Sequence, residues 1–173
     1  DIDLLEDPKI SIVGSRRVSP AGRKITQSLS QELSNSGITI VSGMAVGVDG
    51  IAHESSLDTD GSTIAVMGCG IDTIYPARHK ALFNRISQYG LIISEYPLGY
   101  RPTKYTFPQR NRLVSGLSLG VIIVEAAEKS GTLITARLAL EQNREVMVVP
   151  GSPLNPQYLG SLKLIQEGAI VIC

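Results

Sequence analysis

Residues 120–132 read Gly-Val-Ile-Ile-Val-Glu-Ala-Ala-Glu-Lys-Ser-Gly-Thr, a continuous apolar run that leads into a loop of small and polar residues. A strand with successive rather than alternating apolar side chains is typical of a parallel sheet covered on both faces. The same unit, a short β-rich run followed by a helical segment, recurs along the whole chain. We therefore predict an α/β fold with a doubly wound, mainly parallel sheet of about seven strands and helices on both faces.

The individual elements follow from the same pattern. Predicted strands cover residues 9–14, 38–42, 63–67, 91–94, 120–124, 145–149 and 169–172. Predicted helices cover residues 20 to about 34, 48–57, 78–89, 109–117, 132–142 and 160–166, the first of them capped by Ser19 and opened by Pro20. The one long irregular segment is 95–108, and loops of that length in a compact domain are usually functional.

Length and composition restrict the class of protein. The chain has 173 residues with 16 Lys and Arg against 16 Asp and Glu, which predicts one folded domain over residues 1–173. No apolar run reaches the length of a membrane span, and the acidic start is unlike a signal peptide, so we expect a cytoplasmic protein with no membrane partner. Cys69 and Cys173 lack disulfide or zinc spacing, so we expect reduced thiols and no metal. The chain begins without Met and stops directly after an apolar run, which indicates a domain of a longer protein.

The charges are unevenly spread although they sum to zero. No acid occurs between Asp7 and Glu32, where five cations occur, and none occurs between Glu95 and Glu125. The second stretch interleaves Arg101, Lys104, Arg110 and Arg112 with Tyr96, Tyr100, Tyr105 and Phe107. Cations that neutralise phosphates beside rings that stack on unpaired bases favour single-stranded nucleic acid. The alternative is a solvated loop whose rings pack into the core.

Loops rich in glycine or small residues follow four of the predicted strands, at residues 14–17, 42–50, 68–72 and 125–132. In a parallel sheet these loops share the edge where ligands bind, and glycine lets the backbone approach a phosphate closely. The alternative is that each glycine only makes a tight turn. Neither a Walker A motif nor a complete dinucleotide fingerprint is present.

Six motifs in order give the chain a resemblance to a known family over residues 9–172. They are Val-Gly-Ser-Arg at 13–16, Ser-Gly-Met-Ala-Val-Gly-Val-Asp at 42–49 with Ala-His at 52–53, Gly-Cys-Gly-Ile-Asp-Thr-Ile-Tyr-Pro at 68–76, Phe-Pro-Gln-Arg-Asn-Arg-Leu-Val-Ser-Gly-Leu-Ser at 107–118, Val-Glu-Ala at 124–126 with Ser-Gly-Thr-Leu-Ile-Thr-Ala at 130–136, and Val-Pro-Gly-Ser at 149–152. The chain resembles the Rossmann-like core of the DNA-processing protein A (DprA/Smf) family. It departs from the family pattern at His79 and Leu162.

The resemblance implies a single-stranded DNA-binding protein of natural transformation. Such a protein protects incoming strands, helps to load a RecA-type recombinase, forms a homodimer through the later part of the sheet, and has neither a settled catalytic activity nor a cofactor. The N-terminal helical domain and the C-terminal winged-helix domain of many family members are not in this sequence. The DNA-binding residues that it implies are Arg16, Arg17, Gly43, Lys104, Phe107, Arg110, Asn111 and Arg112, with Ser130, Gly131 and Thr132 as further phosphate candidates.

Physical roles can be assigned to most of these residues. Arg16 and Lys104 are expected to neutralise phosphates, the glycine loops to offer N–H groups, and Phe107 to stack on a base. Asn111 is expected to bond a base edge or its own loop, and residues 130–132 to bind phosphate or to cap a helix.

Other constellations are open to a different interpretation. Asp49 and His53, with Asp72, could form a metal or acid/base site, but a structural role is preferred: Asp49 is expected to cap a helix and His53 to bond a neighbouring loop. A nucleotide-processing enzyme similar to the Rossmann-like phosphoribohydrolases, with Glu125 as base, is the alternative function. This chain lacks the Pro-Gly-Gly-x-Gly-Thr-x-x-Glu motif of those enzymes, so the sequence predicts a binding protein rather than an enzyme.

Overall fold

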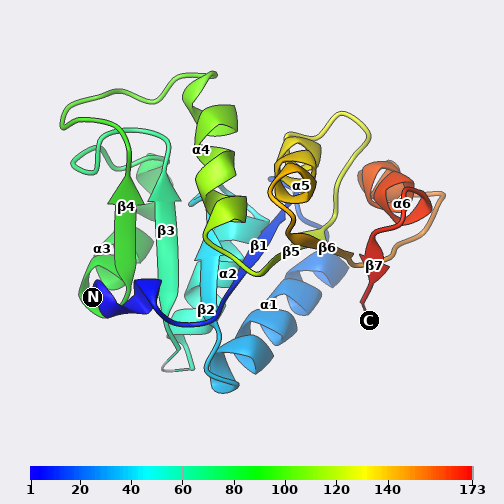
Figure 1. Ribbon diagram of the computed structural model, residues 1–173, viewed down its shortest axis with the longest axis horizontal. Helices are drawn as coiled ribbons and strands as arrows, with labels where there is room; N and C mark the ends of the chain where they lie inside the picture. The colour runs from blue at the N-terminus through cyan, green and yellow to red at the C-terminus, as the bar shows by residue number, and fades with distance from the viewer. Residues whose placement is uncertain (60, 173) are drawn as a thin grey trace.

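The computed structural model describes residues 1–59 and 61–172, and its centre is one seven-stranded sheet (Figure 1). The strands are β1 (Lys9–Gly14), β2 (Thr39–Ser42), β3 (Thr63–Met67), β4 (Leu91–Ser94), β5 (Gly120–Val124), β6 (Glu145–Val148) and β7 (Ile170–Val171). Their order is β4-β3-β2-β1-β5-β6-β7, and every neighbouring pair is parallel. The predicted α/β class and the seven predicted strands are thereby confirmed; the expectation for Cys173 lies outside the described residues.

Helices cover both faces of this sheet. They are α1 (Pro20–Asn35), α2 (Val48–Leu57), α3 (Lys80–Tyr89), α4 (Thr106–Gly116), α5 (Thr132–Glu141) and α6 (Leu159–Gln166), with short 3-10 turns η1 (Asp3–Leu5), η2 (Ala77–His79) and η3 (Pro156–Tyr158). Figure 1 shows α4 and α5 in front of the sheet and α1 behind it. Alternate residues of one strand serve the two faces, because Val13 packs into the cluster under α4 and α5 whereas Ile12 packs against α1 and α2.

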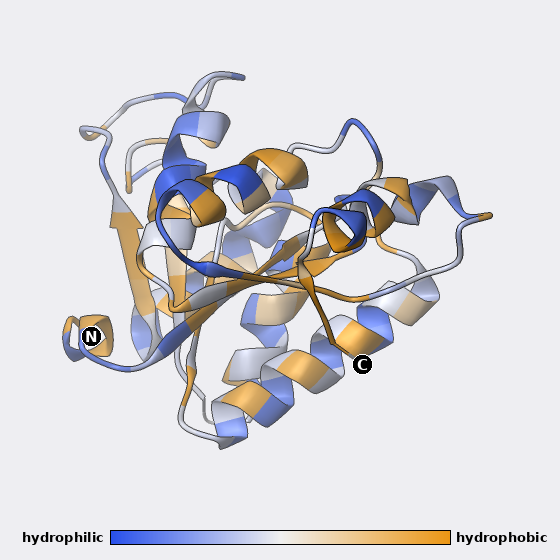
Figure 2. Cartoon of the chain, turned by 45° about the vertical axis from the view of Figure 1, so that its right-hand side comes forward, coloured by the Kyte–Doolittle hydropathy of each residue, from blue (hydrophilic) through white to orange (hydrophobic). Residues whose placement is uncertain are grey.

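The apolar residues of the strands lie between these helical layers. Figure 2 shows hydrophobic strands in the middle of the molecule and helices in which hydrophobic and hydrophilic residues are mixed along the ribbon. A third cluster, which contains Met44, Met67, Leu82 and Ile86, lies beneath α3. Cys69 belongs to that cluster and is buried, so the expectation that it fills a small apolar space is confirmed.

Chain direction across the sheet reverses beside β1. From β1 the chain builds outward through β2, β3 and β4, then returns to place β5 on the other side of β1. At such a switch point the loops after the two adjacent strands, here β1 and β5, run in opposite directions. Ligands of doubly wound folds bind in the crevice between these loops. The fold therefore directs attention to the loops after β1 and β5.

One predicted boundary is wrong in a way that matters for the site. Helix α4 begins at Thr106 rather than at residue 109, so Phe107 and Pro108 lie in its first turn instead of in the preceding loop. Thr103 explains this early start, because its Oγ1 accepts hydrogen bonds from the N–H groups of Tyr105 and Thr106 at 3.3 and 3.4 Å. Proline is tolerated in a first turn, where its missing N–H has no helical partner.

Candidate nucleic-acid interface

A cleft of about 790 Å³ opens at the switch point, at the carboxyl ends of the central strands. Its walls come from the loops after β1, β2 and β5 and from the segment that enters α4. Every predicted DNA-binding residue except Arg112 lines it: Arg16, Arg17, Gly43, Lys104, Phe107, Arg110, Asn111, Ser130, Gly131 and Thr132. Residues that are distant in the sequence are therefore brought to one site, which also includes Lys129, a cation that the sequence analysis did not select.

An aromatic pair forms part of the cleft wall. The rings of Tyr75 and Phe107 stack with centroids 5.4 Å apart and an interplanar angle of 29°. The guanidinium carbon of Arg16 lies 5.8 Å from the centroid of Phe107, within the range of a cation–π contact. Tyr75 was not among the residues predicted to bind DNA, although it belongs to the motif at residues 68–76. The signal that could have identified it is its position in the loop after β3, at the same sheet edge as the other loops.

Arg110 lines the cleft but is not a surface cation. It is only 4% exposed, and its Nη1 donates hydrogen bonds to the carbonyl oxygens of Gly43, at 2.6 Å, and Val66. Burial lowers the pKa of Arg110, while the carboxylate of Asp49 favours its charged form. The guanidinium therefore fastens α4 to the loop after β2 and to the end of β3.

Gly43 is held from its other side by Asp49. Oδ2 of Asp49 accepts hydrogen bonds from the N–H groups of Gly43 and Ala45, at 3.1 and 3.3 Å. Burial raises the pKa of Asp49, and Arg110 opposes that rise. A Cβ at position 43 would lie 2.7 Å from Nη2 of Arg110, so only glycine fits between the two charged groups.

Two expectations for this loop are corrected by these contacts. The Gly43 N–H is engaged inside the protein rather than offered to a phosphate. Asp49 was expected to cap α2, yet it lies in the first turn of that helix and the N-cap position is Gly47. A short carboxylate in the first turn can reach back to the loop, and here the two loop N–H groups provide its partners.

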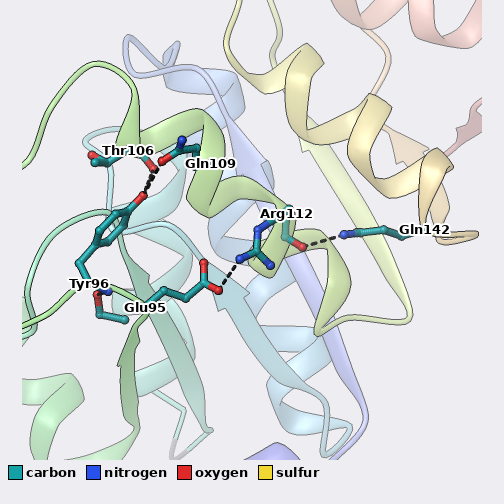
Figure 3. A network of polar contacts seen from close by, with 7 residues as sticks. Glu95, Tyr96, Thr106, Gln109, Arg112 and Gln142 are labelled. Atoms are coloured by element: carbon teal, nitrogen blue, oxygen red, sulfur yellow. Dashed lines mark hydrogen bonds and ion pairs between the residues drawn. The ribbon is translucent and has the colours of Figure 1, made fainter.

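Arg112 lies outside the cleft. It forms an ion pair with Glu95, and its carbonyl oxygen accepts a hydrogen bond from Nε2 of Gln142 at 2.9 Å (Figure 3). In the same view the Tyr96 hydroxyl donates to Oε1 of Gln109 at 3.1 Å. These contacts join α4 to the segment after β4 and to the end of α5. In this structure Arg112 therefore belongs to a packing network that separates it from the other predicted residues.

The loop after β5 presents Ser130, Gly131 and Thr132 at the start of α5. The Ser130 hydroxyl donates to Oγ1 of Thr132 at 2.9 Å and accepts from the Thr132 N–H at 3.2 Å. These bonds order the turn before the helix, as the structural alternative predicts, and the same residues line the cleft. Phosphate binding and ordering of the helix start are thus both compatible with the geometry of this segment. No side-chain hydrogen bond of Asn111 is found among the described residues, although it also lines the cleft.

The candidate acid/base groups do not converge. His53 Nδ1 lies 2.6 Å from Oγ1 of Thr63, at the start of β3 rather than in a loop, and burial lowers the pKa of His53 to about 3. The two carboxylate oxygens of Asp72 share a bifurcated hydrogen bond from the Gly99 N–H. Glu125 is fully buried, and it accepts from the Ser19 N–H at 2.9 Å and from the Tyr158 hydroxyl at 2.8 Å. Each group therefore serves a separate structural contact.

Within the described residues, no helix combines the length and the apolar character that crossing a bilayer requires.

Known proteins resemble the chain in sequence and in fold. The sequence model of the family described as DNA recombination-mediator protein A matches residues 1–173. Protein Smf of Synechocystis sp. is 49% identical over 165 residues, which is 95% of this chain and 42% of that protein. The crystal structure of DNA processing protein A from Streptococcus pneumoniae superposes with a TM-score of 0.93 at 44% identity, covering 99% of this chain and 60% of that one.

A further relative is described in terms of nucleic acid. The structure of DNA processing protein A from Helicobacter pylori, studied for its single-stranded DNA binding mode, has a TM-score of 0.93 at 40% identity and covers 99% of this chain and 79% of that one. The chain spans roughly half the length of the curated relatives that it matches, from 42% of the Synechocystis protein to 61% of the pneumococcal one. The match over all 173 residues and the shared fold confirm the resemblance drawn from the motifs: the chain belongs to the DNA recombination-mediator protein A family.

Proposed function

We propose that this chain binds single-stranded DNA in the cleft at the β1/β5 switch point. The observation that carries the proposal is the meeting of Arg16, from the loop after β1, with Lys104 and Phe107, from the segment that enters α4, around one cleft. Two cations and a ring at one site meet the two requirements of an unpaired strand, which are neutralised phosphates and stacked bases. The relative from H. pylori, which binds single-stranded DNA, supports the same assignment.

The wider role follows from the family. We infer that the chain belongs to a DNA-processing protein of natural transformation, which protects incoming single strands and helps to load a RecA-type recombinase onto them. The name of the family supports the recombination-mediator role, and the names of its relatives support DNA processing. This work would take place in the cytoplasm, where a recombinase has access to the chromosome.

Binding rather than catalysis is the proposed activity. The nucleotide-processing alternative requires an exposed base, but Glu125 is fully buried and its oxygens accept hydrogen bonds from Ser19 and Tyr158. Incubation with nucleoside monophosphates provides a direct check, because release of free base at ordinary enzymic rates would contradict the proposal.

A salt titration tests the binding proposal. If four to six phosphates are contacted, the logarithm of the affinity for a short thymidine homopolymer should fall with the logarithm of salt at a slope of about −3 to −4. Arg16→Ala and Lys104→Ala should weaken binding to every sequence and make the slope shallower. Lys24→Ala is a matched control, because Lys24 lies in the same acid-free stretch but is exposed on α1 outside the cleft lining. Fluorescence anisotropy at two salt concentrations suffices, and a slope near zero would reject the proposal.

We also infer that the chain forms a homodimer through the later part of the sheet. Strand β7 lies at the edge of the sheet, with Ile170 and Val171 exposed, and Leu154 is exposed in the loop before η3. An unpaired apolar edge strand favours association with another chain. Sedimentation equilibrium of Ile170→Lys should show a monomer; a wild-type chain that is monomeric at high concentration would contradict this inference.

A further inference from the structure

Beyond the cleft, residues 100–105 form an exposed surface that we call the tyrosine ledge. It carries the rings of Tyr100 and Tyr105, which are 41% and 67% exposed, with Arg101 and Lys104 between them. In Figure 1 the ledge belongs to the loop that runs from the end of β4 to the start of α4. None of the cleft contacts described above requires these two tyrosines.

The ledge is held in place by hydrogen bonds from both sides. The Gly70 N–H donates to the carbonyl oxygen of Tyr100 at 2.9 Å, and the Gly99 N–H donates to the Asp72 carboxylate at 2.8 and 3.0 Å. At its other end, Oγ1 of Thr106 donates to the Thr103 carbonyl oxygen at 2.9 Å. A surface ordered in this way can accept a ligand without a large cost in backbone entropy.

Both rings are arranged as stacking platforms. Tyr100 is backed by Tyr96, with ring centroids 4.9 Å apart and an interplanar angle of 25°, which leaves Tyr100 with part of its surface toward solvent. The ammonium group of Lys104 lies 5.0 Å from the centroid of Tyr105. A cation beside an exposed ring suits a nucleotide, because the base can stack while its phosphate is neutralised.

The ledge is continuous with the cleft and is locally positive. Pro102, Thr103 and Lys104 line the cleft, so Lys104 is shared by the two surfaces. Residues 96–124 contain no acid, and the preceding Glu95 forms the ion pair with Arg112. The ledge itself therefore carries two cations, Arg101 and Lys104, and no acid, which is complementary to a phosphate backbone.

We propose that a single strand bound in the cleft continues over the tyrosine ledge, with successive bases stacked on Tyr105 and Tyr100. This inference rests on the proposed function and adds a second binding segment to it. One chain then binds more nucleotides than the cleft alone accommodates. Affinity for the strand rises with strand length until the ledge is occupied.

The length dependence of binding tests the proposal. Anisotropy titrations would compare thymidine homopolymers of about four and about twelve nucleotides, the range typical of single-strand sites. Tyr105→Ala and Tyr100→Ala should each weaken binding of the longer strand at least about fivefold and leave the shorter one unchanged, whereas Tyr105→Phe should retain full affinity because the ring remains. Tyr89→Ala is the matched control, since Tyr89 is 68% exposed but lies at the far end of α3.

A strand whose outer half lacks bases gives an independent measure. Wild-type protein should bind such a strand more weakly than Tyr105→Ala binds the intact one, because stacking on both rings is lost. Tyr105→Ala should cause no further loss on the strand without bases. Equal affinity of wild type and both alanine variants for the longer strand would overturn the proposal that the strand continues over the ledge. An equal loss of affinity for the shorter and the longer strand would overturn it too. Failure of the wild-type protein to bind either strand would instead overturn the proposed function itself.

Discussion

The buried guanidinium of Arg110 leads to the sharpest prediction for this fold. Arg110→Met should lower the free energy of unfolding by about 3 to 5 kcal/mol, the usual cost of removing one partner of a buried charged pair. The structural basis is the loss of two charge-assisted hydrogen bonds, to Gly43 and Val66, together with a buried Asp49 that has lost the cation with the larger effect on it. Urea denaturation followed by circular dichroism measures this change.

Arg112→Met provides a control on the same helix. The guanidinium of Arg112 and the carboxylate of Glu95 are each about half exposed, so their ion pair contributes at most about 1 kcal/mol. The hydrogen bonds from Arg110 to Gly43 and Val66 are called the Arg110 clamp. If the two methionine variants lose similar free energy of unfolding, this clamp does not stabilise the fold as much as the burial of Arg110 indicates.

The pH dependence of stability distinguishes the charge of the Arg110 clamp from its packing contribution. Burial raises the pKa of Asp49 and Arg110 opposes that rise, so removal of Arg110 raises this pKa further. A carboxyl with a raised pKa in the folded state contributes stability below its unfolded pKa and loses it as pH rises through the folded value. The deficit of Arg110→Met should therefore shrink as pH is lowered from neutral toward the ordinary aspartate range. Adding Asp49→Asn should remove this pH dependence; a deficit that is constant with pH would argue against an unpaired Asp49.

Three further predictions concern single side chains. Gly22→Ala should destabilise the fold by about 2 kcal/mol or more, because the new Cβ would lie 2.5 Å from Oε1 of the buried Glu125. Gly131→Ala, which has open space around it, should change the thermal unfolding midpoint little. Phe107→Ala should weaken single-strand binding by about 1 to 3 kcal/mol and leave the salt slope unchanged in an anisotropy titration, since stacking releases no counterions. Gly131→Glu should fold normally, weaken binding and make that slope shallower, because it places an anion in the cleft lining.

The sequence predicted most of the fold because its strands are continuous apolar runs. Seven strands and six helices were placed within a few residues, and the switch point beside β1 then located the cleft. The start of α4 was missed because a proline at position 108 suggests a loop. The contacts that favour the earlier start are local hydrogen bonds from the N–H groups of Tyr105 and Thr106 to Thr103.

Within the site, the sequence identified the residue types but not their exposure. Arg110 and Arg112 are two positions apart on α4 and look alike in the sequence, yet one is buried beneath the Gly43 loop and the other pairs with Glu95 on the surface. Which of them faces the sheet depends on the rotation of α4, and that is set by packing with other elements. Charge spacing alone cannot supply this information.

The positive character of the site also has a cause that composition conceals. Acids and bases are equal in number over the chain, but the described cleft lining combines one acid, Asp49, with five cations: Arg16, Arg17, Lys104, Arg110 and Lys129. Asp49 accepts from Gly43 and Ala45, Asp72 accepts from Gly99, and Glu125 accepts from Ser19 and Tyr158. Asp49 and Glu125 are buried and hold their loops from inside the fold, whereas Arg16 and Lys104 line the cleft. A protein with no net charge can thus present a cationic groove, because several of its cations gather at one site and most of its carboxylates lie elsewhere.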